Sequence, residues 1–218
     1  MGQYNKKGMY AGYDKNHKER EKKDYYSTPT EEVVNILNKL NIEFKNDDII
    51  LEPSCGGGHM AKGIKQFLNQ KQLTSKIIAT DIQEREIIKN VEQINFEMGK
   101  EFDFIEDSYP YIENIDYVIM NPPFGLIEPF AMKSLEIAKK GVLMFGRLQF
   151  LEGEKRYVNI IRDNPPTIFY TYVDRIACFK NGDTSIKPSS IQAYAWFYWD
   201  KQKDNKITIA DWIRRVGK

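Results

Sequence analysis

Apolar residues along this chain gather in short, unbroken runs separated by stretches with helical spacing. Strands are predicted at 48–52, 76–81, 101–105, 116–120 and 141–145. Helices are predicted at 29–40, 57–68, 84–94 and 128–140. A strand that is apolar at nearly every position is buried on both faces, so this alternation predicts an α/β fold with helices on both faces of a parallel sheet.

The first helix carries several start signals in the stretch Y-Y-S-T-P-T-E-E. We expect Thr28 to cap this helix and Pro29 to occupy its first position. Glu31 follows Thr28 by three residues and would complete a capping box.

The last third of the chain changes character. A helix is predicted at 154–162, and strands are predicted at 167–173 and 192–199. The stretch from Cys178 to Ile191 contains the turn signals N-G-D and K-P-S-S. Two strands joined without a helix pair most simply as antiparallel neighbours, so we expect a seven-stranded, mostly parallel sheet that ends in an antiparallel pair.

The 218 residues, 41% of them hydrophobic, suffice for one core and one globular domain. No apolar run approaches the roughly 18 residues of a membrane span, and no signal peptide follows the N-terminus, so we expect a cytoplasmic protein without a membrane partner. The cysteines and histidines are Cys55, Cys178, His17 and His59. This set forms neither a disulfide framework nor a metal-ligand cluster, and we expect no metal.

The net charge of +1 is unevenly distributed along the chain. Residues 1–23 and 201–218 each carry +4, which leaves −7 on the middle. Basic ends on an acidic body can dock phosphates near one face, as a polyanion-binding protein requires. Lys-rich termini are also common as solvated, disordered segments, and the sequence leaves both interpretations open.

A glycine-rich loop, E-P-S-C-G-G-G-H-M-A, links the first strand to the next helix. Gly56, Gly58 and Ala61 satisfy the pattern G-x-G-x-x-G/A, in which glycines let the backbone approach a nucleotide-type ligand. Asp81 ends the second strand, where a carboxylate can accept hydrogen bonds from both hydroxyls of a ribose. A plain tight turn and a plain helix cap explain the same residues, and the geometry serves NAD and S-adenosylmethionine equally.

The fourth strand ends in Y-V-I-M-N-P-P-F-G. The exocyclic amine of adenine is a poor nucleophile because its lone pair is delocalised into the ring, and two acceptors that hold both N–H groups would free that lone pair. Asn121 can supply its side-chain oxygen and Pro122 its backbone carbonyl, which the rings of Pro122 and Pro123 keep aimed. Phe124 offers a flat face for an extruded base. The alternative is an ordinary strand-ending turn.

The chain contains Asn-Pro-Pro twice. The second copy, D-N-P-P-T at 163–167, follows a predicted helix and has Thr167 in place of the aromatic residue. It is typical of a helix stop. Only Asn121 follows a parallel strand, at the edge where open sheets bind their ligands.

With these motifs the chain resembles the amino-group methyltransferases of the Rossmann-like class I S-adenosylmethionine-dependent fold, and especially the small adenine-N6 DNA methyltransferases of phages and prophages. The resemblance covers Tyr25 to about Trp199 and rests on Y-Y-S-T-P, the glycine loop, T-D-I, D-F-I and N-P-P-F. It implies S-adenosyl-L-methionine as cofactor, DNA as partner and N-P-P-F as the catalytic tetrad. The cofactor residues that it implies are Tyr26, Thr28, Pro29, Glu52, Ser54, Cys55, Gly56, Gly58, Asp81, Ile82, Asp103 and Phe104.

The segments G-R-L-Q-F-L-E-G-E-K-R, R-I-A-C-F and Y-A-W-F-Y-W are similar to the phage branch. They imply that Arg147, Glu152, Arg156 and Arg175 line the target side of the site, with surface salt bridges as the alternative. The expected organisation is a basic, flexible arm at 1–24, a methyltransferase domain at 25–200 and a basic tail at 201–218. The family branch with this motif order has a target-reading domain last. Here only the tail follows, so sequence specificity would come from the arm, the 178–191 loop, the tail, a specificity partner or a homodimer.

Other functions share part of these features. The same tetrad methylates glutamine amides in release factors, but those enzymes carry a helical domain ahead of the sheet, and the first 24 residues are too few and too polar to form one. Adenine in RNA would fit the same pocket. An NAD-dependent oxidoreductase would use the glycine loop and leave N-P-P-F unexplained. A catalytically inactive module that binds nucleic acid would not need an intact tetrad.

Overall fold

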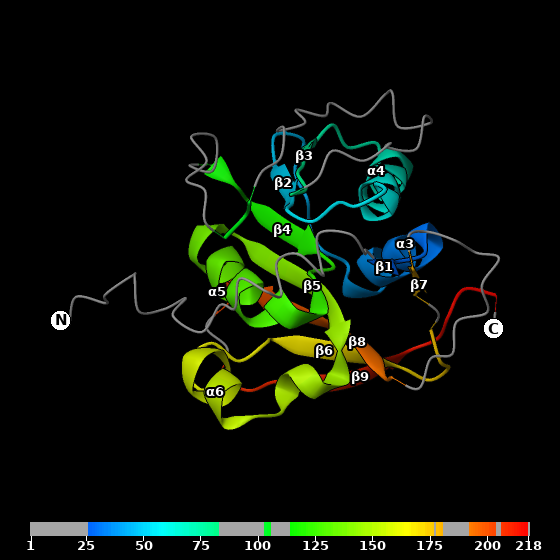
Figure 1. Cartoon of the computed structure of the whole chain (residues 1–218). Coiled ribbons are helices and arrows are strands. Elements are labelled where there is room, and N and C mark those ends of the chain that lie inside the picture. Colours follow the sequence, from blue (N-terminus) through cyan, green and yellow to red (C-terminus); the bar gives the residue numbers. More distant parts are fainter. Residues whose placement is uncertain are drawn as a thin grey trace.

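The computed structural model describes residues 26–82, 103–105, 114–176, 178–180, 192–203 and 206–217 (Figure 1). The predicted arm at 1–24 and the predicted helix at 84–94 lie outside these residues, as does most of the 178–191 loop.

The centre of the molecule is a seven-stranded mixed sheet. In spatial order its strands are β3 (Lys76–Ala79), β2 (Ile49–Glu52), β4 (Tyr117–Met120), β5 (Gly141–Arg147), β8 (Tyr194–Asp200), β6 (Ile168–Tyr172) and β9 (Ile209–Ile213). Six of these strands are parallel to one another, and β8 lies antiparallel between β5 and β6. The predicted parallel sheet and the antiparallel pairing of the last two predicted strands are confirmed.

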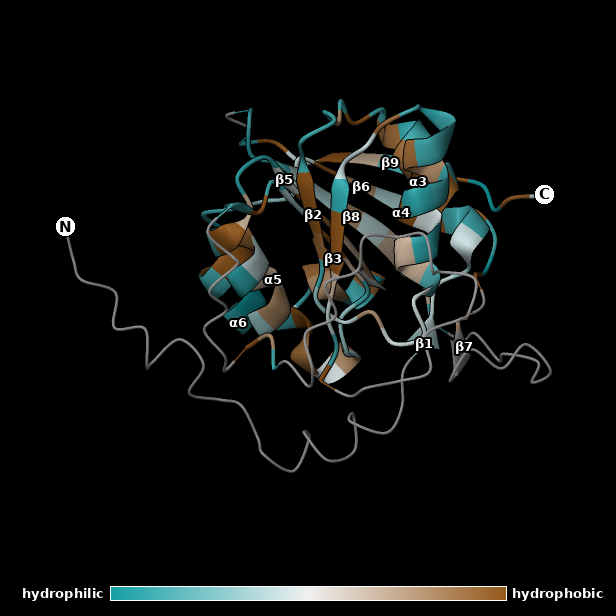
Figure 2. Cartoon of the chain, turned by 90° about the horizontal axis from the view of Figure 1, so that it is seen from above, coloured by the Kyte–Doolittle hydropathy of each residue, from teal (hydrophilic) through white to brown (hydrophobic). Residues whose placement is uncertain are grey.

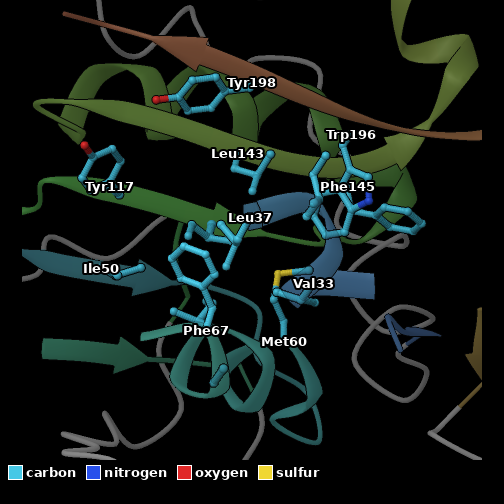
Figure 3. Close-up of a cluster of buried hydrophobic side chains, with 14 of the residues drawn as sticks. Val33, Leu37, Ile50, Met60, Phe67, Tyr117, Leu143, Phe145, Trp196 and Tyr198 are labelled. Carbon is cyan, nitrogen blue, oxygen red and sulfur yellow. The ribbon is translucent and has the colours of Figure 1, made fainter. Parts of the chain in front are cut away.

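Helices cover both faces of the sheet, as Figure 2 shows from above. One face packs against α3 (Thr30–Leu40) and α4 (His59–Gln70), and Figure 3 shows their buried side chains, including Val33, Leu37 and Phe67, against the sheet. The two helices approach closely at Gly63, where a Cβ would lie 2.6 Å from the Cβ of Val33. The other face packs against α5 (Ile127–Ile137) and the helical turns α6 (Glu154–Arg156) and η5 (Tyr157–Ile161). The short turns η3 (Phe124–Leu126) and η4 (Leu148–Leu151) follow β4 and β5.

The C-terminal segment is a correction to the predicted tail. Residues 209–213 form β9, which pairs in parallel with β6 and buries Ile213. Its sequence, I-A-D-W-I, is largely apolar but lies within the basic C-terminal segment, and its pairing with β6 is what identifies it as a strand of the sheet. The predicted strand at 101–105 is not found in its described part, because 103–105 form a turn whose Phe104 is buried in the core.

The six parallel strands have their carboxyl ends at the same end of the sheet. We call this end the carboxyl edge, and the candidate site lies there. A small two-stranded sheet of β1 (Tyr26–Ser27) and β7 (Phe179–Lys180) joins the start of the described chain to its last third. The second Asn-Pro-Pro lies at the opposite edge, where the parallel strands begin. It stands between η5 and the start of β6, which confirms that it stops a helix.

Candidate active site

The glycine loop after β2 has a backbone that depends on its glycines. Gly56 and Gly58 have φ angles of 52° and 76°, a left-handed region that residues with a Cβ rarely occupy. The Gly56 N–H donates to Oδ2 of Asp81 at 2.8 Å, so the ends of β2 and β3 are directly connected. Gly58 precedes α4, whose N-terminus therefore starts in the loop.

The glycine loop also contacts the N-P-P-F loop after β4. The hydroxyl of Ser54 donates to the backbone carbonyl of Asn121 at 3.1 Å. Two of the motifs predicted to form one site are thus brought together by a hydrogen bond across neighbouring parallel strands.

The side-chain amide of Asn121 has a defined orientation. Its Nδ2 donates to the backbone carbonyl of Tyr26 at 2.8 Å and to the hydroxyl of Thr28 at 3.0 Å. A carbonyl can only accept, so the nitrogen must face the 26–28 segment, and both of its hydrogens are used. Among the described residues neither Oδ1 of Asn121 nor the carbonyl of Pro122 accepts a hydrogen bond. Two acceptors therefore remain at the tip of β4.

Thr28 has this role instead of the predicted helix cap. The helix α3 begins at Thr30, preceded by Pro29, with no side-chain cap, and the buried Thr28 hydroxyl faces Asn121. The predicted cap is wrong because a contact 93 residues away outcompetes the local one. The carbonyl of Pro29 accepts the N–H groups of Glu32 and Val33.

Aromatic rings surround Phe124. The ring of Tyr26 lies 5.3 Å from that of Phe124, and the ring of Tyr194 lies at 5.8 Å. The guanidinium carbon of Arg147 is 4.3 Å from the Phe124 centroid, a cation–π contact. Arg147 also hydrogen-bonds Tyr194, although burial raises the pKa of this tyrosine to about 12. Tyr194 is not among the predicted site residues, because its place beside the site depends on the pairing of β8 with β5, which sets it opposite Arg147.

Glu52 is a buried carboxyl beneath the glycine loop. Burial raises its pKa to about 8, a backbone hydrogen bond from Ala61 opposes this rise, and the charge of Asp81 adds to it. Its Oε2 has no hydrogen-bond partner. A buried acceptor without a partner is costly unless a ligand uses it. At neutral pH this carboxyl is mostly protonated, and a nearby cation would favour its charged form.

The remaining predicted cofactor residues differ in their surroundings. Cys55 is buried in the loop, and Ile82 is half-buried after Asp81. Phe104 lies in the core beside Phe130, with ring centroids 5.0 Å apart. Asp103 accepts the N–H of Ile105 at 3.1 Å. No hydrogen bond or ring contact among the described residues joins Phe104 to the glycine loop.

The predicted target-side residues also separate. Arg156 donates to the carbonyls of Gln149, Phe150 and Glu152 at 2.7 to 3.1 Å, so its guanidinium holds the turn after β5. Glu152 and Arg175 are exposed. Arg147 contacts the tetrad through the ring of Phe124.

Within the part of the chain that the structure describes, no helix is both long and apolar enough to cross a membrane. No group of three or more His, Cys, Asp or Glu side chains in that part of the chain could hold a metal ion.

Comparison with known proteins identifies the fold. No family model and no curated protein matches the chain. A methyltransferase subunit of a type I restriction-modification system from Streptococcus thermophilus matches with a TM-score of 0.62 and 13% identity, over 86% of this chain and 47% of that subunit. This chain thus spans about half of that subunit's length.

Two further structures agree. A protein from Listeria monocytogenes described as a class I S-adenosylmethionine-dependent methyltransferase matches with a TM-score of 0.63 and 14% identity, over 97% of this chain and 71% of its own. An S-adenosylmethionine-dependent O-methyltransferase from Thermotoga maritima matches at 0.51 and 15%, over 80% and 66%. With the strand order and the helices on both faces, these likenesses show that the chain has the Rossmann-like fold of class I methyltransferases.

Proposed function

We propose that this protein transfers a methyl group from S-adenosylmethionine to the N6 amine of adenine in DNA. The observation that carries the proposal is the orientation of Asn121: its amide hydrogens are bound internally, so Oδ1 is left as an acceptor beside the Pro122 carbonyl. An exocyclic amine has two N–H groups, and these two acceptors match them. A turn that only ended the strand would not require two hydrogen bonds that fix the orientation of the Asn121 amide.

The residues around the glycine loop fit this cofactor. S-adenosylmethionine carries a cationic sulfonium and an ammonium group, and the unpartnered Oε2 of Glu52 is a buried acceptor suited to positive charge. The bond from Gly56 fixes the carboxylate of Asp81 at the end of β3, where a carboxylate can accept hydrogen bonds from ribose hydroxyls. When bound, the cofactor supplies an electrophilic methyl group. The positive φ angles of Gly56 and Gly58 leave space for close approach to the backbone.

The chain's own residues then hold the amine. Oδ1 of Asn121 and the Pro122 carbonyl would accept the two N–H groups and favour a geometry in which the nitrogen lone pair is free. As the new N–C bond formed and the methyl–sulfur bond broke to leave a neutral thioether, the amine would become cationic, and the same acceptors would stabilise that charge. One of its protons then leaves to water. Holding both reactants in line contributes further to the rate.

Phe124 supports the base through its ring. Stacking on an aromatic side chain contributes about 1 to 3 kcal/mol per base. A guanidinium and a base both present flat faces to a ring, so the contact of Arg147 with Phe124 identifies a ring face that accepts a planar group. We expect Arg147 to leave the ring when a base arrives and to pair with a nearby phosphate.

DNA is the favoured substrate for two reasons. The acceptors on Asn121 and Pro122 and the ring of Phe124 fit an extruded adenine. One protein of the same fold is the methyltransferase subunit of a restriction-modification system. RNA remains an outcome of the test, because an unpaired adenine presents the same edge.

The test is tritiated methyl transfer from S-adenosylmethionine to duplex DNA, single-stranded DNA, RNA and total protein, followed by nucleoside mass spectrometry. We expect N6-methyladenine in DNA and its loss in Asn121→Ala. Asn164→Ala is the matched control, because Asn164 stands in the second Asn-Pro-Pro at the opposite edge and should leave activity unchanged. Methyl groups on cytosine, RNA or protein would reject the assignment. Calorimetric binding of NAD in place of S-adenosylhomocysteine would favour an oxidoreductase.

A further inference from the structure

The segment after β9 is fixed along the carboxyl edge of the sheet. The Val216 N–H donates to Oε1 of Glu32 at 2.9 Å, and the amide of Asn35 donates to the carbonyl of Arg214 at 2.8 Å. The Val173 N–H donates to the carbonyl of Ile213 at 3.0 Å. Contacts with α3 and with the end of β6 therefore determine the path of residues 214–216, which the sequence alone would leave as a solvated tail.

This segment brings arginines together from two parts of the sequence. Arg214 and Arg215 follow β9, and Arg175 follows β6. The guanidinium of Arg215 donates to the carbonyl of Arg175 at 3.0 Å, which joins the two segments. Arg175 and Arg214 are exposed. We call Arg175, Arg214 and Arg215 the arginine edge.

The nearby acids leave this edge positive. Glu32 is buried, and its oxygens accept from Val216, Tyr172 and Asn35. Asp211 faces Lys39, with 3.2 Å between their charged atoms. Asp174 is half-buried and is the one acid within 173–176 and 214–216. Three arginines against the carboxylates of Glu32 and Asp174 leave a local excess of positive charge.

The arginine edge lies on the same side of the sheet as the proposed site. The strands β4, β5, β6 and β9 are parallel, so their carboxyl ends lie at one edge of the sheet. Arg147 ends β5, and Asn121, Arg175 and Arg214 follow β4, β6 and β9, so all four lie toward that edge. The strand order separates β4 from β9 by four strand spacings, which is about 19 Å at about 4.8 Å each. A duplex of that length contains roughly six base pairs at 3.4 Å each.

We infer that the arginine edge binds the phosphate backbone of DNA that flanks the target adenine, about half a helical turn away. The inference rests on the proposed function, since it takes the base extruded toward Asn121 as its reference point. It gives the C-terminal strand a role in substrate binding: β9 extends the sheet and thereby carries the arginines to the substrate side. Contacts of this kind position DNA and do not by themselves read its sequence.

The first test measures DNA affinity against salt concentration. The variant Arg175→Gln/Arg214→Gln removes two charges from the edge. The control Lys45→Gln/Lys71→Gln removes two exposed charges at the opposite edge, before β2 and after α4. We expect the slope of log affinity against log salt to fall by about 2 in the first variant and to stay unchanged in the control.

The second test locates the contact. Cys55 and Cys178 are both buried, so Arg214→Cys introduces an accessible thiol for a photo-crosslinker. We expect crosslinks at about three to seven base pairs from the target adenine, the range around the roughly six pairs that the strand spacing gives. The same reagent on Lys71→Cys should give none.

The outcomes separate the two proposals. If the unaltered protein methylates DNA while the Arg175→Gln/Arg214→Gln variant keeps its affinity and salt slope, the inference that the arginine edge binds DNA is wrong and the proposed function stands. Crosslinks without a preferred position would also contradict DNA binding at the arginine edge. If the unaltered protein neither binds nor methylates DNA, both proposals fail together.

Discussion

The hydrogen bond between Thr28 and Asn121 offers the sharpest test of the site. Replacing Thr28 with valine keeps the size of the side chain and removes the hydroxyl that accepts from Nδ2 of Asn121 at 3.0 Å. The bond from Nδ2 to the Tyr26 carbonyl remains, so the amide loses one of its two restraints. We therefore expect slower methyl transfer and not its abolition.

The magnitude follows from the energy of one buried hydrogen bond. Such a bond contributes about 0.5 to 1.5 kcal/mol. If that energy serves to orient Oδ1 in the transition state, kcat falls by about 2- to 12-fold, since about 1.4 kcal/mol is tenfold in rate. The KM for S-adenosylmethionine should change little, because the glycine loop is untouched. The free energy of unfolding should fall by about 1 kcal/mol.

The assay is single-turnover methyl transfer to duplex DNA, with urea denaturation of the same samples. Thr30→Val is the matched control, because it removes a hydroxyl two residues away that donates to the His59 carbonyl at 3.1 Å. The Thr30→Val variant should have a lower free energy of unfolding and an unchanged rate of methyl transfer, and Thr28→Ser should keep both at the level of the unaltered protein. A Thr28→Val protein with wild-type kcat, or a Thr30→Val protein that is equally slow, would refute the argument that this bond orients Asn121.

Three further predictions concern other parts of the molecule. The raised pKa of Glu52, about 8, means that the folded state holds its proton more tightly than the unfolded state, so ligand-free stability should fall from pH 4.5 to about 8. Glu52→Gln should flatten this slope in thermal unfolding scans, and an unchanged slope would contradict the burial argument. Arg147→Ala should raise the KM for DNA by roughly tenfold without changing calorimetric cofactor binding, and Arg147→Lys should not restore it; an unaltered KM would remove Arg147 from the target side. Gly63→Ala should lower the free energy of unfolding by about 1 to 3 kcal/mol in urea, because its Cβ would meet Val33, and a neutral result would mean that α3 and α4 can separate at little cost.

The sequence by itself determined the main strands and the two loops that meet in the site. Short apolar runs predicted β2, β3, β4 and β5, because a strand buried on both faces needs apolar residues at nearly every position. The glycine spacing predicted the turn between β2 and α4, and the structure shows that Gly56 and Gly58 have a left-handed backbone there, which few other residues adopt. Position along the chain also distinguished Asn121 from Asn164, since one follows a parallel strand and the other ends a helix.

Only the tertiary structure decided how these pieces are used. Local spacing marked Thr28 as a helix cap, but its hydroxyl faces Asn121, which is 93 residues away. The largely apolar stretch I-A-D-W-I lies in the predicted tail, and only its pairing with β6 makes it the edge strand β9. For Thr28 and for β9 the deciding partner is brought near by folding, and a contact between distant segments leaves no periodic signature in the residues that make it.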